Sequence, residues 1–362
     1  MGQQTPLYKQ HLAAGAKIVD FSGWDMPINY GSQIEEHLQV RQQAGVFDVS
    51  HMTVIDVTGG DAKPFLRYLL ANDVDKLAEN GSALYSAMLN RAGGVVDDLI
   101  VYLRPNGYRL VVNCATREKD LAWITGHSPS FDVQVEEQPE LAILAVHGPD
   151  SIDKLCSLLP EDQARQVQAL GNFQGVEFGD WQIARTGYTG EKGLELIFPA
   201  GEAPGLWRKL LAADVRPVGL AARDTLRLEA GMNLYGQDMD ETVSPLSANM
   251  KQTIAWDPQN RDFIGRDSVT EHRRQLEQGQ LPVLAGLVLE SRGVLRHGQK
   301  VITNAGEGII TSGSYSPTLK QSIALARIPL HAQDCQVDLR GNLVPVRKVQ
   351  PNFVRQGKKL FN

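Results

Sequence analysis

Three β-rich runs joined by glycine turns lie between Ala83 and Asn113, and they constrain the fold of this 362-residue chain more than any other feature. The runs read LYSAMLN, VVDDLIVYLR and YRLVVN, and the turns contain AGG and PNG. Such runs predict consecutive antiparallel hairpins. A helix is expected near residues 116–125, followed by the strand FDVQVEE. This β-β-β-α-β order is typical of an α+β domain rather than a doubly wound parallel sheet.

A serine-to-glutamate spacing predicts the first firm helix. In Ser32-x-x-Glu35 both side chains can satisfy free amides at a helix start, so we expect a helix over residues 33–44 that Gly45 closes. Residues 46–57 alternate loosely between apolar and polar, which predicts a single strand.

A polar stretch divides the chain near its last quarter. SVTEHRRQLEQGQL, residues 268–281, offers few side chains to a core, and short strands with glycine and proline turns follow from about Val283. Those strands predict a small β-barrel or sandwich. The length favours about two to three domains. We therefore expect a main region over residues 1–275 and a barrel domain over residues 281–362.

Charge and cysteine usage narrow the function classes. The 36 Lys and Arg residues against 42 Asp and Glu give a net charge of -6, which argues against binding nucleic acid or an anionic membrane. The three cysteines form no CxxC pair, so neither a disulfide framework nor a thiolate metal site is indicated, and a reducing cytoplasm fits best. The start of the chain lacks the apolar segment of a secretion signal, and no long apolar run predicts a membrane span.

Common catalytic motifs are missing from the sequence. It has no GxGxxG after a strand, no Walker loop, no HExxH and no GxSxG. Dinucleotide oxidoreductases, P-loop enzymes, zinc proteases and common serine hydrolases are therefore disfavoured. His37, His51, His147 and His297 stand singly, which favours structural roles for them.

Two carboxylates in the run GGVVDDLIV are the first candidate for chemistry. Because side chains alternate across a strand, Asp97 shares a face with Val95 and Leu99, and Asp98 lies on the other face. The two cannot act as a close dyad. Burying an ionised carboxylate is costly, so at least one should meet a polar cavity, a cation or a ligand. Alternatively, both only bond to amides of the glycine turn.

A glycine-rich loop between two expected strands is the second candidate. In GYTGEKGLE, starting at Gly187, the glycines allow positive φ angles and let a flat ligand lie close to the backbone. Tyr188 could stack on a heterocycle, and Glu195 could accept two N–H groups from an amino-pyrimidine edge. The alternative is a flexible hairpin whose Glu195 faces water.

An arginine pair and a basic tail complete the candidates. Arg223 and Arg227 lie four residues apart on a helix expected over residues 218–230, either as an exposed ion-paired face or with a substrate carboxylate on Arg223. Residues 339–362 carry six basic side chains and no acidic one, which indicates a solvated surface or a landing site for an anionic ligand or partner.

Five blocks, in order along the chain, closely resemble the aminomethyltransferase family, the T-proteins of the glycine cleavage system. The resemblance runs from about Pro6 to the basic tail. The blocks are FDVSHM from Phe47, GGVVDDLIVY from Gly93, RTGYTGEKGLEL from Arg185, GLAARDTLRLEAGM from Gly219, and TSGSYSPTLKQSIALA from Thr311.

The resemblance implies an α+β, multidomain fold: ferredoxin-like and interleaved α/β lobes around a folate cavity, plus a small C-terminal β-barrel. It implies a tetrahydrofolate-dependent aminomethyltransferase without a metal. The substrate would be the aminomethyl group on the reduced lipoyl arm of the H-protein, and the products ammonia and methylenetetrahydrofolate. The P- and L-proteins of the same system would be functional associates, and the cytoplasm the location.

The resemblance also implies roles for single residues. Asp97 matches the active-site aspartate, beside the folate nitrogens that receive the one-carbon unit. Tyr188 and Glu195 match pterin-contacting positions, and Arg223 matches a substrate-binding arginine. The positions said to line the cavity are Met52, Tyr85 and Asn113.

The chain departs from the family pattern at two places. Thr53 stands where many members have glycine, which affects the shape of the cavity. The tail lacks the tyrosine that some relatives use, so no binding residue is assigned to it. Its basic charge remains a hypothesis for docking the H-protein or a polyglutamate folate.

Two other functions within the same superfamily are alternatives. One is a folate-dependent demethylase, but the sequence lacks the dinucleotide-binding half that fused versions carry. The other is a folate-binding accessory protein in iron–sulfur assembly. Such proteins carry a cysteine in a KGC-type motif, where this chain has RTGYTGE.

Overall fold

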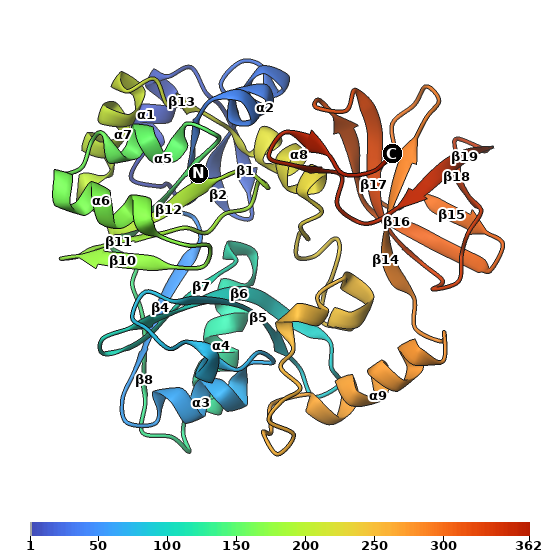
Figure 1. Ribbon diagram of the computed structural model, residues 1–362, viewed down its shortest axis with the longest axis horizontal. Helices are drawn as coiled ribbons and strands as arrows, with labels where there is room; N and C mark the ends of the chain where they lie inside the picture. Colours follow the sequence, from blue (N-terminus) through green and yellow to red (C-terminus); the bar gives the residue numbers. More distant parts are fainter. Residues whose placement is uncertain (1) are drawn as a thin grey trace. The chain divides into compact units, whose positions relative to one another are not determined.

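The structure is a computed structural model that describes residues 2–362. The chain divides into two compact units, each made of three segments. Of the described residues, unit 1 holds 2–63, 75–84 and 100–226, and unit 2 holds 64–74, 85–99 and 227–362. Two α-helices and two strands labelled in Figure 1 include residues of both units: α3 (Ala62–Leu69), β5 (Ala83–Leu89), β6 (Val95–Arg104) and α8 (Leu220–Ala230). The short 3-10 helix η1 (Val74–Lys76) does so too.

A six-stranded sheet forms the centre of unit 1. Its order is β10-β11-β12-β9-β3-β13, and neighbouring strands pair antiparallel except β13 and β3, which are parallel. The strands are β10 (Gly175–Phe178), β11 (Trp181–Ala184), β12 (Gly193–Pro199), β9 (Leu141–His147), β3 (Gly45–Asp48) and β13 (Arg216–Pro217).

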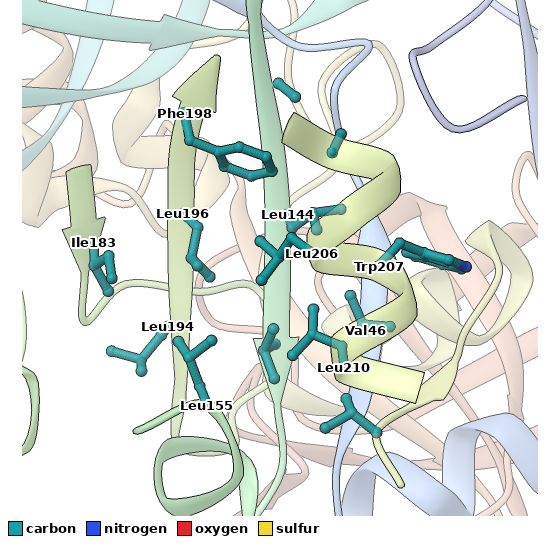
Figure 2. Packing of buried hydrophobic residues seen from close by; sticks show 14 of the residues in the cluster. Val46, Leu144, Leu155, Ile183, Leu194, Leu196, Phe198, Leu206, Trp207 and Leu210 are labelled. Carbon is teal, nitrogen blue, oxygen red and sulfur yellow. The ribbon is translucent and has the colours of Figure 1, made fainter. Parts of the chain in front are cut away.

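Both faces of this sheet are buried, which explains why β9 reads as the continuous apolar run LAILAVH. Leu144 and Val146 belong to one core cluster, whereas Ile143 and Ala145 belong to another. Three helices contribute to the first cluster: α5 (Ser151–Cys156), α6 (Glu161–Ala169) and α7 (Ala203–Ala212). Figure 2 shows Leu206 and Leu210 of α7 beside Leu144.

The second face of the sheet meets different elements of unit 1. Val40 of α2 (Gln33–Gln42) and Ala222 and Leu226 of α8 pack there. Tyr102 of β6 and Val54 of β4 (Thr53–Thr58) join the same cluster. A polar side chain on this face of β12 therefore points into the interior rather than into solvent.

A second sheet has the order β5-β6-β7-β4-β8. Its further strands are β7 (Gly107–Val112) and β8 (Gln134–Glu137), and α4 (Arg117–His127) connects them. The pair β6–β7 is antiparallel, as the hairpin pattern predicts. The pairs β7–β4 and β4–β8, which that pattern does not address, are antiparallel too. The expected β-β-β-α-β order is thus confirmed.

The N-terminal elements are fixed by a buried polar chain in unit 1. These elements are α1 (Tyr8–Ala13), β1 (Lys17–Phe21) and β2 (Trp24–Asn29). Asp48 accepts hydrogen bonds from Thr5 Oγ1 at 2.6 Å and lies 2.8 Å from His11 Nε2. The other ring nitrogen of His11 lies 2.8 Å from Tyr30 Oη. These bonds lower the pKa of Asp48 against the opposing effect of its burial.

A closed barrel is the main part of unit 2, with the order β14-β17-β16-β15-β18-β19. Its strands are β14 (Val283–Leu289), β15 (Lys300–Thr303), β16 (Gly306–Ser316), β17 (Gln321–Ile328), β18 (Cys335–Leu339) and β19 (Asn342–Val349). The short hairpin β20 (Val354–Arg355) and β21 (Lys358–Lys359) follows. The α+β, multidomain fold with a small C-terminal barrel is confirmed.

Two local expectations need correction. Residues 46–57 form two strands of different sheets, β3 and β4, because the chain turns between Val49 and Met52. The capped helix ends at Gln42, and Gly45 instead begins β3, where a Cβ would lie 2.5 Å from Val218. The polar stretch near residues 268–281 is largely the helix α9 (Arg266–Glu277), whose one buried residue is Val269.

The cap of α2 agrees with the sequence pattern. Ser32 Oγ accepts a hydrogen bond from the Glu35 amide at 3.3 Å, as predicted. None of the helices in residues 2–362 is long and apolar enough to cross a membrane.

Candidate functional site

Asp97 is the third residue of β6, in unit 2, and is fully buried. Its strand neighbours Val95 and Leu99 on the same face are buried too, whereas Asp98 is half-buried. Tyr85 of β5 donates a hydrogen bond from Oη to Asp98 Oδ2 at 2.8 Å. The two carboxylates thus occupy different environments, as strand alternation predicts.

The glycine turn before Asp97 is closed by Asn90. The Gly94 amide donates to Asn90 Oδ1 at 3.0 Å, and the Gly93 amide donates to the Asn90 carbonyl. A Cβ at Gly94 would lie 1.8 Å from the Glu241 carbonyl oxygen, so only glycine fits there. Asn90 therefore satisfies both glycine amides of this turn.

The loop between β11 and β12 wraps around the buried ring of His147, within unit 1. A Cβ at Gly187 would lie 2.3 Å from His147 Cε1, and one at Gly193 would lie 2.3 Å from His147 Cδ2. Gly190 has the positive φ, at 77°. Close approach at Gly187 and Gly193 therefore makes room for a protein side chain, the ring of His147.

Glu195 projects from β12 toward the interior of unit 1 and is half-buried. Its Oε2 accepts a hydrogen bond of 2.5 Å from Thr186 Oγ1, whose oxygen lies 3.1 Å from Tyr102 Oη. Burial, and next the charge of Glu195, raise the pKa of Tyr102, so this phenol stays a neutral donor. The alternative in which Glu195 faces water is wrong.

Arg223 of α8 lies against two aromatic rings in unit 1. Its guanidinium carbon is 4.8 Å from the centroid of Tyr188 and 5.8 Å from that of Phe47. Burial lowers the pKa of Arg223, while the nearby charges of Glu195 and Tyr188 raise it. Among residues 2–362, Arg223 Nη1 is one of the buried atoms without a hydrogen-bond partner. A buried donor of this kind calls for an acceptor from a ligand.

The charge of Arg223 affects the pKa values of two buried histidines. Burial, and also Arg223, lower the pKa of His147 to about 3. Burial lowers the pKa of His51 to about 4, with Asp48 opposing the shift and Arg223 adding to it. Both rings are therefore neutral near pH 7.

The remaining candidates are divided between the two units. Met52 is half-buried against the cluster that includes Phe47 and Tyr102, and Asn113 is half-buried before α4; both belong to unit 1. Tyr85 and Asp97 belong to unit 2. Arg227 is not on an exposed face: it is 1% exposed and pairs with Asp238 at 2.8 Å in unit 2. The described residues contain no group of three or more His, Cys, Asp or Glu arranged to hold a metal ion.

Tyr188, Glu195 and Arg223 form a polar cluster in unit 1, which we call the unit 1 cluster. Sequence reasoning missed several residues that shape it. Tyr102 and Thr186 hold Glu195, and Arg41 and His147 hold the loop that carries Tyr188. Only the RTGYTG run gave any signal for Thr186. The other contacts join residues far apart in the chain, so no local pattern could have revealed them.

The unit 1 cluster combines a carboxylate, a guanidinium with an unused donor, and an aromatic ring. Such a set suits a flat heterocycle with N–H donors and an anionic group. Fold and site together define a class: a multidomain α+β protein with a closed barrel near its C-terminus and a half-buried polar site for a small, flat ligand.

Comparison with known proteins identifies the family within this class. Residues 7–258 match the family model of the GCVT N-terminal domain, and residues 283–355 match that of the glycine cleavage T-protein C-terminal barrel domain. The chain belongs to the aminomethyltransferase family, the glycine cleavage T-proteins.

Full-length relatives support this assignment. The aminomethyltransferase of Pseudomonas syringae pv. tomato is 58% identical over 363 residues, covering 100% of both chains. That of Chromobacterium violaceum is 58% identical over 361 residues, covering 99% of both. The crystal structure of glycine cleavage system aminomethyltransferase T from Bartonella henselae superposes with a TM-score of 0.88 at 34% identity, covering 97% of both chains.

Proposed function

We propose that this protein is the aminomethyltransferase of a glycine cleavage system. It moves the aminomethyl carbon from the dihydrolipoyl arm of the H-protein to tetrahydrofolate, giving methylenetetrahydrofolate and releasing ammonia. The observation that carries the proposal is the 58% identity over the whole chain with relatives named aminomethyltransferase.

In this proposal Asp97 is the catalytic residue. Release of ammonia leaves a cationic, iminium-like carbon on the transferred group, and a desolvated carboxylate stabilises such developing charge. The full burial of Asp97 supports this role, because a buried anion interacts more strongly than one in water. Asp97 would also orient the accepting nitrogen, so positioning contributes to the rate.

Tyr188, Glu195 and Arg223 are proposed to bind tetrahydrofolate, which supplies the nitrogen that accepts the carbon. The residues fit such a ligand: Glu195 is a half-buried acceptor, and Arg223 Nη1 is a buried donor without a partner among residues 2–362. Tyr188 offers a ring face already stacked on a cation. By the family resemblance, Met52, Tyr85 and Asn113 are also proposed as folate-binding residues.

The proposal extends to organisation and partners. The lipoylated H-protein is the substrate carrier, and the P- and L-proteins are functional associates. A cytoplasmic location fits the three free cysteines, Cys114, Cys156 and Cys335. Residues 1–275 form the folate-binding region and residues 281–362 the barrel domain.

One assay tests the proposal directly. Purified protein is mixed with reduced lipoylated H-protein, methylenetetrahydrofolate and ammonia, and the H-protein is weighed by mass spectrometry. We expect the aminomethyl adduct, which should be missing when the protein is omitted. Tetrahydrofolate binding with no adduct would favour a folate-binding accessory protein instead.

A further inference from the structure

The loop that carries Tyr188 is held by Arg41, which comes from α2 in the same unit. Arg41 Nη1 donates to the Thr189 carbonyl and to Glu191 Oε1, each at 2.7 Å. Its Nη2 donates to the Leu226 carbonyl of α8 at 3.3 Å. The Arg41 and Glu191 side chains are each only 3% exposed, so one buried guanidinium links the loop to two helices.

His147 holds the same loop from the other side. Its Nδ1 lies 2.8 Å from Thr189 Oγ1, and its ring fills the space between Gly187 and Gly193. Thr189 Oγ1 also accepts a hydrogen bond from the Glu191 amide at 3.3 Å. Both residues that flank Tyr188, Gly187 and Thr189, therefore have fixed positions.

These contacts matter because of what the loop presents. Tyr188 lies between the two held residues, and its ring stacks on Arg223. A loop with glycine at 187, 190 and 193 has much conformational freedom to lose, and freedom lost on binding weakens affinity. A loop ordered beforehand avoids that cost.

Stability alone is a weak reason for burying the Arg41–Glu191 pair. Desolvation offsets much of the attraction in a buried ion pair, and apolar replacements often do as well. Such pairs instead fix the positions of the groups that they join, and the planar guanidinium can bond to three carbonyl or carboxylate oxygens at once.

We propose that Arg41 and His147 are positioning residues that clamp residues 186–193 so that Tyr188 stays stacked on Arg223, ready for the folate. The inference rests on the proposed function for its folate consequence. The clamp itself concerns only contacts within unit 1 and can be tested without any ligand.

The test uses Arg41→Lys, which keeps the positive charge but cannot reproduce the hydrogen bonds of the planar guanidinium to Thr189, Glu191 and Leu226. We expect tetrahydrofolate to bind about tenfold more weakly and KM to rise in proportion, with kcat within about twofold of wild type. Arg109→Lys is the matched control, since Arg109 forms a buried ion pair with Asp56 elsewhere in unit 1; its folate affinity should stay native. If Arg41→Lys fails to fold, Glu191→Gln replaces it, with the same expectation.

A double-mutant cycle separates positioning from general damage. If Arg41 acts through Tyr188, adding Arg41→Lys to the Tyr188→Ala protein should weaken tetrahydrofolate binding by less than about twofold. His147→Ala should weaken binding as Arg41→Lys does. His147→Asn, which can offer a polar group near the Nδ1 position, should restore part of the loss.

Hydrogen exchange of the backbone amides supplies the readout that needs no folate. We expect residues 187–192 to exchange at least about tenfold faster in Arg41→Lys while the rest of unit 1 stays protected. Native exchange in that loop, or a tenfold loss of folate affinity that persists in the Tyr188→Ala background, overturns the clamp. If wild-type protein binds no tetrahydrofolate, the proposed function fails and the exchange result alone decides on the clamp.

Discussion

Replacing Glu195 by glutamine removes one negative charge and almost nothing else. The amide oxygen of glutamine can still accept the hydrogen bond from Thr186 Oγ1 that Glu195 receives at 2.5 Å. The countercharge that helps to keep Arg223 protonated is lost, so the pKa of Arg223 should fall further. A hydrogen bond to a charged group contributes about 1.5–3 kcal/mol, so tetrahydrofolate affinity should fall about 10- to 150-fold.

Equilibrium titration with tetrahydrofolate, followed by tryptophan fluorescence or calorimetry, measures this loss. Glu177→Gln is the matched control: it makes the same charge change on β10 of the same sheet, where Glu177 pairs with Arg104. The control should bind folate normally. A Glu195→Gln protein that folds and binds with native affinity would refute the pterin-contacting role of Glu195.

Two further predictions concern stability. The pKa of His51 is about 4 in the folded protein and about 6.5 in the unfolded chain, so the unfolded chain binds more protons as the pH falls. Between pH 7 and pH 4, the wild type should therefore lose about 3 kcal/mol more unfolding free energy than His51→Gln, as measured by urea unfolding. Parallel pH dependences of the two proteins would contradict this. The carboxylate of Asp238 accepts four hydrogen bonds in unit 2, including one from Arg227 at 2.8 Å. Asp238→Asn should therefore lower the unfolding free energy by about 3–5 kcal/mol. A loss under about 1 kcal/mol would show that the buried Arg227–Asp238 pair is not needed for stability.

Local signals in the sequence predicted local structure well. The cap at Ser32 and the glycine turns between Ala83 and Asn113 depend on neighbouring residues, and the structure contains both. The same logic failed at residues 46–57, where the turn at Val49–Met52 contains no glycine or proline to mark the break between two strands. The N-terminal hairpin β1–β2 went unpredicted, because its side chains are mostly half-exposed and give no clear alternation.

The site shows the same division between local and distant information. Strand alternation correctly separated Asp97 from Asp98, and glycine spacing pointed to the loop that carries Tyr188. The reasons for those glycines lie in His147, and the loop is held by Arg41, about 150 positions from Glu191 in the chain. Contacts between residues so far apart in the chain leave no periodic pattern in the sequence. Similarly, the burial of Arg227 follows from a pairing with Asp238 that helix spacing cannot show.

Turnover of the Asp97→Asn protein tests the central claim most directly. The measurement is methylenetetrahydrofolate formation from aminomethylated H-protein, with tetrahydrofolate affinity determined on the same sample. Loss of the charge that stabilises the departing-ammonia transition state should lower kcat about 10²- to 10³-fold while affinity stays within about threefold of wild type. Turnover at the wild-type rate would contradict the account, because the buried carboxylate would then have no part in the transfer.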